Sequence, residues 1–184
     1  MAKDSKSKKT NGKAKKPTDA IMLLKADHRT VLDLFEQFES ARGDDKKLAL
    51  AQQICTELKV HAQIEEEIFY PAFRGRIDDD LLDEACVEHD SAKVLINDVM
   101  ANGAAAEYFE AKVTVLGEEV RHHIKEEERG KEGMFAQCRE TDVDLVALRD
   151  QLMARKEELM GQAAADGLPP AQLTALDLQP SAAT

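Results

Sequence analysis

Residues 51–72 read AQQICTELKVHAQIEEEIFYPA and place a histidine and a glutamate on the apolar side of a predicted helix. The apolar residues recur at alternating steps of three and four, which is the seam of a helix packed in a bundle. His61 and Glu65 occupy two consecutive seam positions, so both side chains are expected to face the core. Since a buried carboxylate is costly unless it is paired or bound to a metal, this stretch predicts a polar site inside a helical bundle.

The same arrangement recurs in a second stretch, where His123 and Glu127 also lie four residues apart on an apolar seam. Two further stretches carry a single histidine on the seam, His28 in the first and His89 in the other. Four imidazoles and two carboxylates form a ligand set for transition metals. The predicted metal ligands are therefore His28, His61, Glu65, His89, His123 and Glu127.

Capping and turn residues set the limits of the four helices. The first begins at a cap on Thr18 or Asp19, and Pro71 is expected to kink or close the second. The first predicted helix ends near residue 41. The other three cover about residues 45–70, 79–102 and 105–129. Short turns at Gly43 and Gly103 favour antiparallel neighbours. The sequence therefore predicts an all-α, up-down-up-down four-helix bundle over residues 18–140.

Three other regions flank this bundle. Residues 141–165 predict an extra C-terminal helix, with leucines on one face that pack outside the bundle or against a partner. Residues 1–17 contain seven lysines and one acid, and this disordered basic tail could contact nucleic acid weakly. Residues 166–184 contain three prolines and are expected to form a flexible tail.

The composition fits a single helical domain, because the 184 residues are 43% hydrophobic but only 4% aromatic, with no tryptophan. The net charge of −11 would repel nucleic acid from the body of the protein. No apolar run is long enough to span a membrane and no signal sequence is recognised, so we expect a cytoplasmic protein. The three cysteines lack a pairing motif, which fits a reducing compartment and a role as buried filler.

The candidate side chains also have an interpretation without metal, as a buried network of hydrogen-bonded histidines and glutamates. In the glutamate runs 65–67 and 126–128, only one member of each is expected to face inward, with the others solvated. His122 and Glu128 remain alternates to His123 and Glu127, because neighbouring helical positions differ by a rotation of about 100°.

The order of the motif separates two kinds of metal-binding bundle. Ferritin-like di-iron proteins use a glutamate followed three residues later by a histidine, whereas here the histidine comes first and the glutamate follows four residues later. Over about residues 20–136 the chain resembles hemerythrin-like proteins of the HHE cation-binding family. The matching motifs are Asp27-His28, His61-x3-Glu65-Glu66 followed by Phe69-Tyr70-Pro71, Glu88-His89-Asp90, and His123-x3-Glu127-Glu128.

This resemblance implies a non-haem, oxo- or hydroxo-bridged centre of two iron ions inside the bundle. Glu65 and Glu127 would bridge the irons, and the four histidines would be terminal ligands. Hemerythrins proper have a further histidine at the position of Lys93, so this chain is expected to leave more coordination positions open. We therefore predict a di-iron protein that reacts with a small ligand such as O2, nitric oxide or peroxide, for sensing, iron storage or oxidative and nitrosative protection.

Two alternatives remain open at this point. The first is a di-iron peroxidase or oxidase, in which Lys93 and Tyr70 are the nearest polar groups that could donate protons. The second is a helical interaction module that does not use metal. Because Arg129-Gly130-Lys131 interrupts the last helix of the bundle, that helix is also expected to open near the site as a gate for small ligands.

Overall fold

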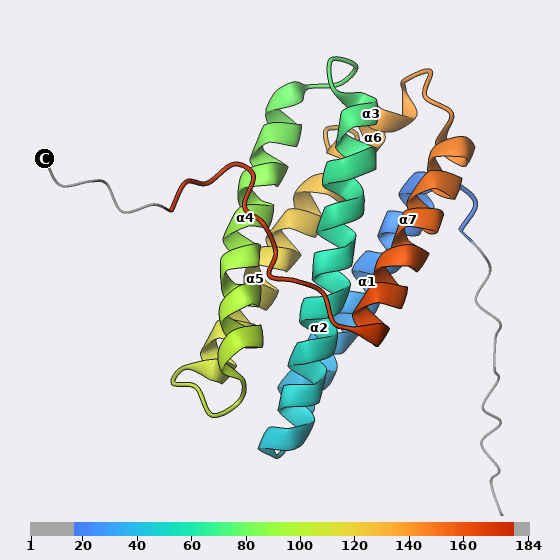
Figure 1. Cartoon of the computed structure of the whole chain (residues 1–184). Helices are drawn as coiled ribbons and strands as arrows, with labels where there is room; N and C mark the ends of the chain where they lie inside the picture. The colour runs from blue at the N-terminus through green and yellow to red at the C-terminus, as the bar shows by residue number, and fades with distance from the viewer. Residues whose placement is uncertain (1–16, 179–184) are drawn as a thin grey trace, which may run out of the picture.

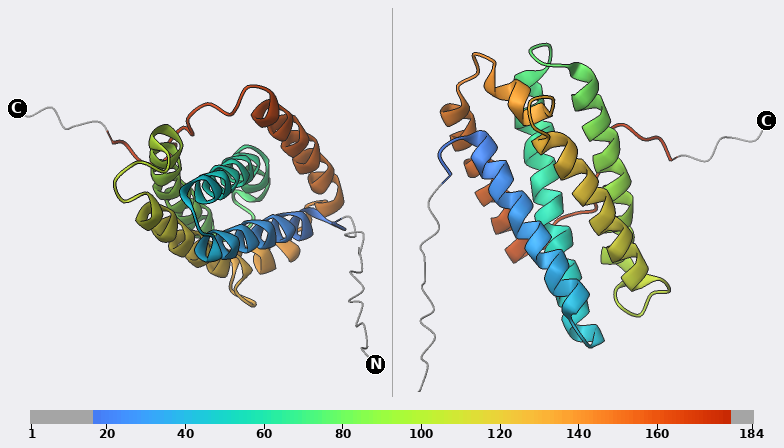
Figure 2. Two further views of the ribbon diagram at one scale, coloured as in Figure 1. Left: turned by 90° about the horizontal axis from the view of Figure 1, so that it is seen from below. Right: turned by 180° about the vertical axis from the view of Figure 1, so that it is seen from behind.

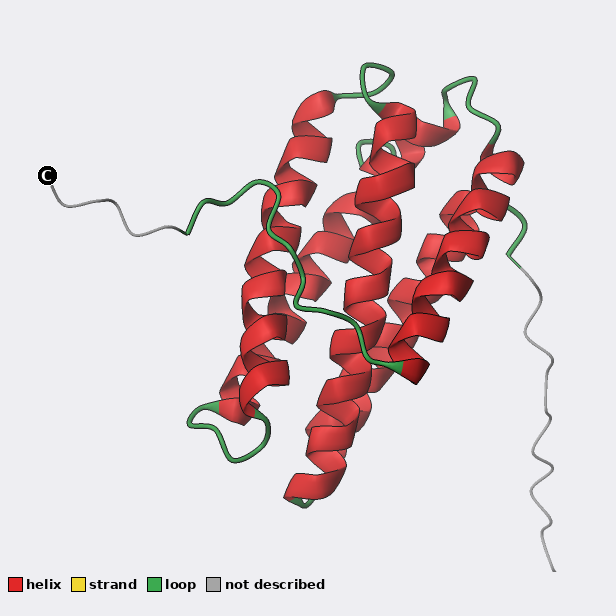
Figure 3. Cartoon of the chain, in the orientation of Figure 1, coloured by secondary structure: helices red, strands yellow, loops and turns green. Residues whose placement is uncertain are grey.

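The computed structural model describes residues 17–178, and every regular element in this range is helical. Four long helices form the bundle (Figure 1 and Figure 3): α1 (Ala20–Ser40), α2 (Asp44–Ile64), α4 (Asp79–Asn102) and α5 (Phe109–Glu128). Contacts run from α1 to α2, from α2 to α4, from α4 to α5 and from α5 back to α1. The prediction of an all-α four-helix bundle is confirmed.

The helix ends follow the expected chemistry. The Asp19 carboxylate caps α1 by accepting a hydrogen bond from the backbone N–H of Met22 at 2.9 Å. Gly43 precedes α2 with a φ of +89°, a left-handed conformation that glycine adopts without strain. The fourth bundle helix begins later than predicted, at Phe109, because Tyr108 before it also has a positive φ.

The second helix of the bundle does not continue regularly to Tyr70. After α2 the chain forms a π-helical segment, η1 (Glu65–Phe69), and then the short helix α3 (Tyr70–Phe73). The backbone N–H of Tyr70 donates to the carbonyl of Glu65, five residues back. Pro71 has no N–H to continue an α-helical ladder, which favours this irregular turn. As a result Glu65 and Tyr70 share a buried face, with 0% and 2% of their surface exposed.

Three elements follow the bundle. A short helix that the sequence did not predict, α6 (Met134–Arg139), is followed by α7 (Leu145–Ala165), which matches the expected extra helix. The view along the bundle in Figure 2 shows α2 between α4 on one side and α7 on the other, and α7 contacts α1 and α2. Residues 167–178 then cross the surface of α2 to reach α4 (Figure 1).

The expectation of a flexible tail from residue 166 did not anticipate these contacts on α2 and α4. The basic tail falls almost entirely outside the described residues, as do residues 179–184. Among the described residues, no helix is both long and apolar enough to cross a membrane.

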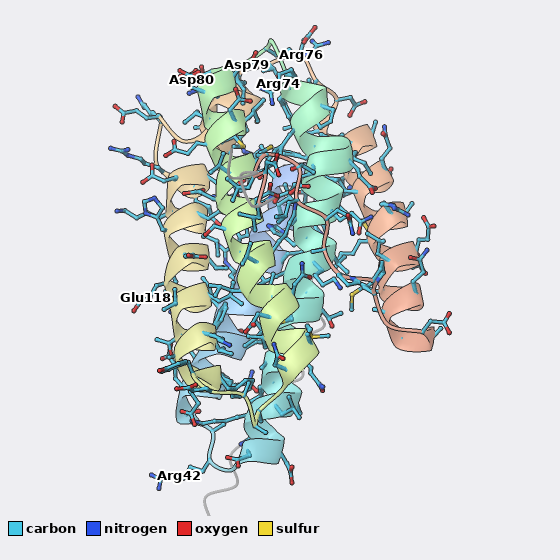
Figure 4. All side chains as sticks on the ribbon, turned by 60° about the vertical axis from the view of Figure 1, so that its left-hand side comes forward. Arg42, Arg74, Arg76, Asp79, Asp80 and Glu118 are labelled. Carbon is cyan, nitrogen blue, oxygen red and sulfur yellow. The ribbon has the colours of Figure 1, made fainter. Side chains whose placement is uncertain are left out.

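Two apolar clusters fill the core, and the candidate ligands lie at the level between them. Along α1, Leu24 belongs to one cluster, Val31 to the other, and His28 lies between them. Along α4, His89 likewise lies between Ala85 of the first cluster and Ile96 of the second. The charged side chains that Figure 4 labels point outward, with Arg74 at one end of the bundle and Arg42 at the other. The buried histidines and glutamates therefore form a polar layer within an otherwise apolar interior.

Candidate metal centre

Four helical segments bring the predicted ligands to one place. Each of the six residues is at most 9% exposed, and the group consists of His28 of α1, His61 of α2, Glu65 of η1, His89 of α4, and His123 and Glu127 of α5. Their nitrogen and oxygen atoms form two overlapping groups, within each of which the atoms lie no more than 4.8 Å apart. Glu65 belongs to both groups. The structure thus gathers all six residues that the sequence singled out.

The four imidazoles are arranged as two pairs. The Nε2 atoms of His28 and His61 lie 3.2 Å apart, and those of His89 and His123 lie 3.3 Å apart. Two nitrogens bound to one metal ion at about 2.1 Å lie roughly 3 Å apart when they subtend a right angle. Each pair therefore has the spacing of two ligands on one ion.

Each glutamate spans both histidine pairs. One oxygen of Glu127 lies 3.2 Å from Nε2 of His28 and 3.5 Å from Nε2 of His123. One oxygen of Glu65 lies 3.2 Å from Nε2 of His61 and 3.4 Å from Nε2 of His89. Both carboxylates are thus placed between the pairs rather than within one of them.

The outer nitrogens of three histidines face carboxylates. Nδ1 of His28 lies 2.8 Å from Glu128, and Nδ1 of His89 lies 2.9 Å from Glu66. Nδ1 of His123 lies 2.8 Å from Glu88. Nδ1 of His61 lies 3.8 Å from Asp27. An ionised carboxylate only accepts hydrogen bonds, so these imidazoles donate from Nδ1 and present a lone pair on Nε2. Such partners orient metal-binding histidines and raise their donor strength.

This finding corrects the interpretation of the glutamate runs. Glu66 and Glu128 were expected to be solvated, but their side chains are only 15% and 20% exposed because each contacts a histidine. The structure also decides between Glu127 and Glu128 as the inward carboxylate. Glu127 faces the core, whereas Glu128 lies on the outer side of His28. The side chain of His122 is 60% exposed and lies outside the buried group, which it approaches only through Glu88, 3.4 Å from its Nε2.

The residues fit a bound cation. With Nδ1 donating, the two Nε2 atoms of a pair would face each other lone pair to lone pair, which is unfavourable unless a proton or a metal ion lies between them. One oxygen of Glu65 is buried without a hydrogen-bond partner, and the buried oxygen of Glu127 has only the Nε2 atoms of His28 and His123 beside it. Unpaired buried carboxylate oxygens are costly, and coordination to a metal satisfies them.

The electrostatics of the site favour the same conclusion. Burial lowers the pKa of the His28 imidazole, but Glu127 and Glu128 outweigh this effect and raise that pKa to about 9. Burial and the charge of Glu127 raise the pKa of Glu65. Burial also acts to raise the pKa of Glu127, but the imidazoles of His123 and His28 lower it. The site therefore stabilises added positive charge.

Two aromatic side chains complete the walls of the site. The Tyr70 hydroxyl lies 3.4 Å from Glu65, 3.3 Å from Glu127 and 3.4 Å from Nε2 of His89. The ring of Phe135, from the unpredicted α6, stacks on His28 with 5.7 Å between centroids. Phe135 is 2% exposed, so α6 covers the end where a gate was expected. That gate stays a prediction.

Lys93 does not contact the candidate ligands directly. Its ammonium donates to Glu66 at 2.8 Å and to Asp90 at 2.9 Å. The sequence placed Lys93 close to the site as a possible proton donor, and the structure shows it one carboxylate away from His89.

A small cavity adjoins the inner side of all four histidines. Its volume is about 40 Å³, and its other walls combine three charged residues, Glu88, Lys93 and Glu119, with the apolar Val31, Leu58, Ala62, Ala92, Ile96, Val120 and Ile124. A cavity needs about 10–15 Å³ to hold one water molecule. The site therefore has room for a small ligand against a largely apolar wall.

This bundle, with its core of imidazoles and carboxylates, belongs to the class of metal-binding helical bundles. A family model described as the hemerythrin HHE cation binding domain matches residues 19–135, and the chain belongs to this family. The family resemblance inferred from the sequence is thereby confirmed. Membership implies that the chain binds a metal cation.

Two comparisons add context. A crystal structure of a hemerythrin HHE cation binding domain-containing protein from Mycobacterium kansasii superposes with a TM-score of 0.68 at 23% identity. The match covers 82% of this chain and 94% of that one, and it supports the fold. A protein named DNA nickase from a Nostoc species is 28% identical over 119 residues, which are 65% of this chain and 34% of the nickase. The chain thus matches about a third of that relative's length.

Proposed function

We propose that this chain binds two iron ions in the bundle and reacts with a small ligand such as O2, nitric oxide or peroxide. The observation that carries the proposal is the position of Glu65 and Glu127, each between a histidine of one pair and a histidine of the other. A carboxylate in that position can share its charge between two ions. One ion would be held by His28 and His61, and the other by His89 and His123.

Iron suits this donor set because imidazole and carboxylate ligands bind it in non-haem sites and leave open positions for exogenous ligands. When bound, the two iron ions would supply one-electron chemistry and affinity for oxygen-containing or nitrogen-containing small molecules. The protein contributes the mostly apolar cavity, which has room for a small uncharged ligand. Sensing, iron storage and oxidative or nitrosative protection all use this chemistry.

A second candidate is a di-iron peroxidase or oxidase, which the position of Tyr70 favours. Its hydroxyl is fully enclosed and lies within reach of both glutamates and His89. A general acid must come within about 2.6–3.2 Å of the reacting atom, and Tyr70 lies beside the residues that would hold the metal ions. Burial and the neighbouring glutamates raise the pKa of Tyr70, so the phenol keeps its proton.

The proposal is tested by loading the purified full-length chain with ferrous iron without oxygen and then adding O2 or nitric oxide. We expect near-ultraviolet charge-transfer absorption that changes when each ligand is added. The His122→Ala variant is the matched control, because this exposed histidine should leave the spectra unchanged.

Loss of the spectra in His123→Ala but not in His122→Ala would support the centre. A chain that binds iron without any spectral response to either ligand would contradict the proposed reactivity. Sustained turnover of hydrogen peroxide by the iron-loaded protein would favour the enzyme over the binding protein.

A further inference from the structure

The segment of residues 168–176 is fastened to the bundle by side chains of α2 and α4. Lys59 of α2 donates to the carbonyls of Leu168 and Pro169. Asn97 of α4 donates to the carbonyl of Ala171 at 2.9 Å and accepts from its N–H at 2.8 Å. Figure 1 shows this stretch crossing α2 on its way to α4. The segment is therefore packed along much of its length.

Asp90 of α4 receives the end of this segment. One oxygen of its carboxylate accepts hydrogen bonds from three successive backbone N–H groups, those of Thr174, Ala175 and Leu176, at 2.8, 2.6 and 2.8 Å. Asp90 is 0% exposed. Consecutive N–H groups that converge on one anion form a stabilising concavity. Without the segment, this buried carboxylate would lose most of its hydrogen bonds.

The contacts continue from Asp90 to a candidate metal ligand. The other oxygen of Asp90 accepts from Lys93 at 2.9 Å, and Lys93 donates to Glu66 at 2.8 Å. Glu66 in turn accepts from Nδ1 of His89 at 2.9 Å. An unbroken series of charge-assisted hydrogen bonds thus links the segment to His89.

His28 offers a contrast on the other side of the site. Its Nδ1 partner, Glu128, pairs with Lys25 at 2.9 Å, and these residues all belong to α1 and α5. The outer contacts of His28 therefore lie within the bundle. Those of His89 extend to a segment that follows α7 in the chain.

We propose that residues 168–176 complete the metal centre from outside the bundle, with Asp90 and Lys93 as positioning residues for His89. The docked segment fixes Asp90, which holds Lys93 against Glu66, and Glu66 sets the ring orientation and donor strength of His89. The inference rests on the proposed function in one respect, since it takes His89 as a ligand. Replacing such outer partners commonly lowers metal affinity about 10- to 100-fold.

Two substitutions in the full-length chain test this inference with cobalt(II) as the probe metal. Asp90→Asn removes the charge that holds Lys93, and Asn97→Ala removes both hydrogen bonds to Ala171 without touching the series that leads to His89. The matched controls on the same helix are Asp83→Asn, which affects an exposed pair with Arg74, and Asn102→Ala, which affects a local contact with Asp98.

The readouts are the visible cobalt spectrum during titration and the protease sensitivity of residues 168–176. We expect Asp90→Asn to weaken one of two cobalt equivalents by about tenfold, and Asn97→Ala to weaken the same equivalent less while exposing the segment to protease. Both controls should match the wild type.

Equal weakening of both equivalents in Asp90→Asn would indicate a general structural role and would overturn the inference. If Asp90→Asn does not fold, the Asn97→Ala variant tests the inference instead. In that variant, release of residues 168–176 with unchanged cobalt affinities and spectrum would also overturn the inference. A wild-type chain that bound no cobalt or iron would overturn the proposed function and this inference together. Wild-type binding with unaffected variants would overturn this inference alone.

Discussion

The two histidine pairs of the candidate centre have nearly the same spacing but different surroundings. The pair of His28 and His61 lies in a group that contains both glutamates. The pair of His89 and His123 lies in a group with Glu65 alone, and the Tyr70 hydroxyl approaches His89 there. Glu127 approaches the first pair more closely, since its oxygen lies 3.2 Å from Nε2 of His28 but 3.5 Å from Nε2 of His123. On the proposed function, we therefore expect an exogenous ligand to bind in the half that contains His89 and His123, where Glu127 lies farther from the histidine nitrogens.

The largest effect is expected from Glu65→Ala, because Glu65 belongs to both halves. We expect this variant to lose most of its capacity for both iron ions, as measured by elemental analysis after anaerobic loading. Its control is Glu67→Ala, which removes an exposed glutamate of the same run that pairs with Arg155. Full iron content in Glu65→Ala would show that the two halves do not share this carboxylate.

A second prediction separates the halves. His61→Ala and His89→Ala should each bind about one iron fewer than the wild type. The iron that remains in His61→Ala should still change its absorption when nitric oxide is added, whereas the iron in His89→Ala should respond weakly. Equal responses in the two variants would remove the functional difference between the halves.

The third prediction concerns the Tyr70 hydroxyl, which approaches His89 in the second half of the centre. Tyr70→Phe should keep its iron, because no histidine or glutamate is removed. If Tyr70 supplies a proton, peroxide turnover by the iron-loaded chain should fall by about a hundredfold. Tyr108→Phe is the control, since Tyr108 is 68% exposed. Unchanged turnover in Tyr70→Phe would exclude the phenol as the proton donor.

The smallest effect is expected in the cavity. Ala92 lines it, and Ala92→Val should slow the binding of nitric oxide severalfold without altering iron content. Stopped-flow absorption measures this rate. Val94→Leu, on the same helix but 39% exposed, should leave the rate unchanged. A rate for Ala92→Val equal to that of the wild type would mean that the ligand does not pass through or occupy this cavity.

The seam periodicity of the sequence was enough to predict the bundle and to choose the six inward side chains. It chose His123 over His122 because an α-helix without insertions keeps its phase. The same argument could not predict η1, because a π-helical turn breaks that phase and depends on Pro71 and the surrounding packing. The sequence placed Tyr70 near the site, but its position against both glutamates was accessible only from the structure.

The partners of the histidines were also beyond the sequence. Glu66 and Glu128 sit beside inward glutamates in charged runs, and such runs usually face solvent. Asp90 looked like an ordinary polar residue of the motif, because the backbone N–H groups that donate to it lie more than eighty residues away in a stretch without helical periodicity. Contacts between distant irregular segments leave no periodic signal.

The central claim, that Glu65 and Glu127 join two metal ions, is tested most directly by electron paramagnetic resonance of the oxidised, iron-loaded chain. Bridged ferric ions couple their spins, so the account predicts about two irons per chain with almost no signal from isolated ferric iron. A signal from isolated ferric iron that accounts for all of the bound metal would contradict it.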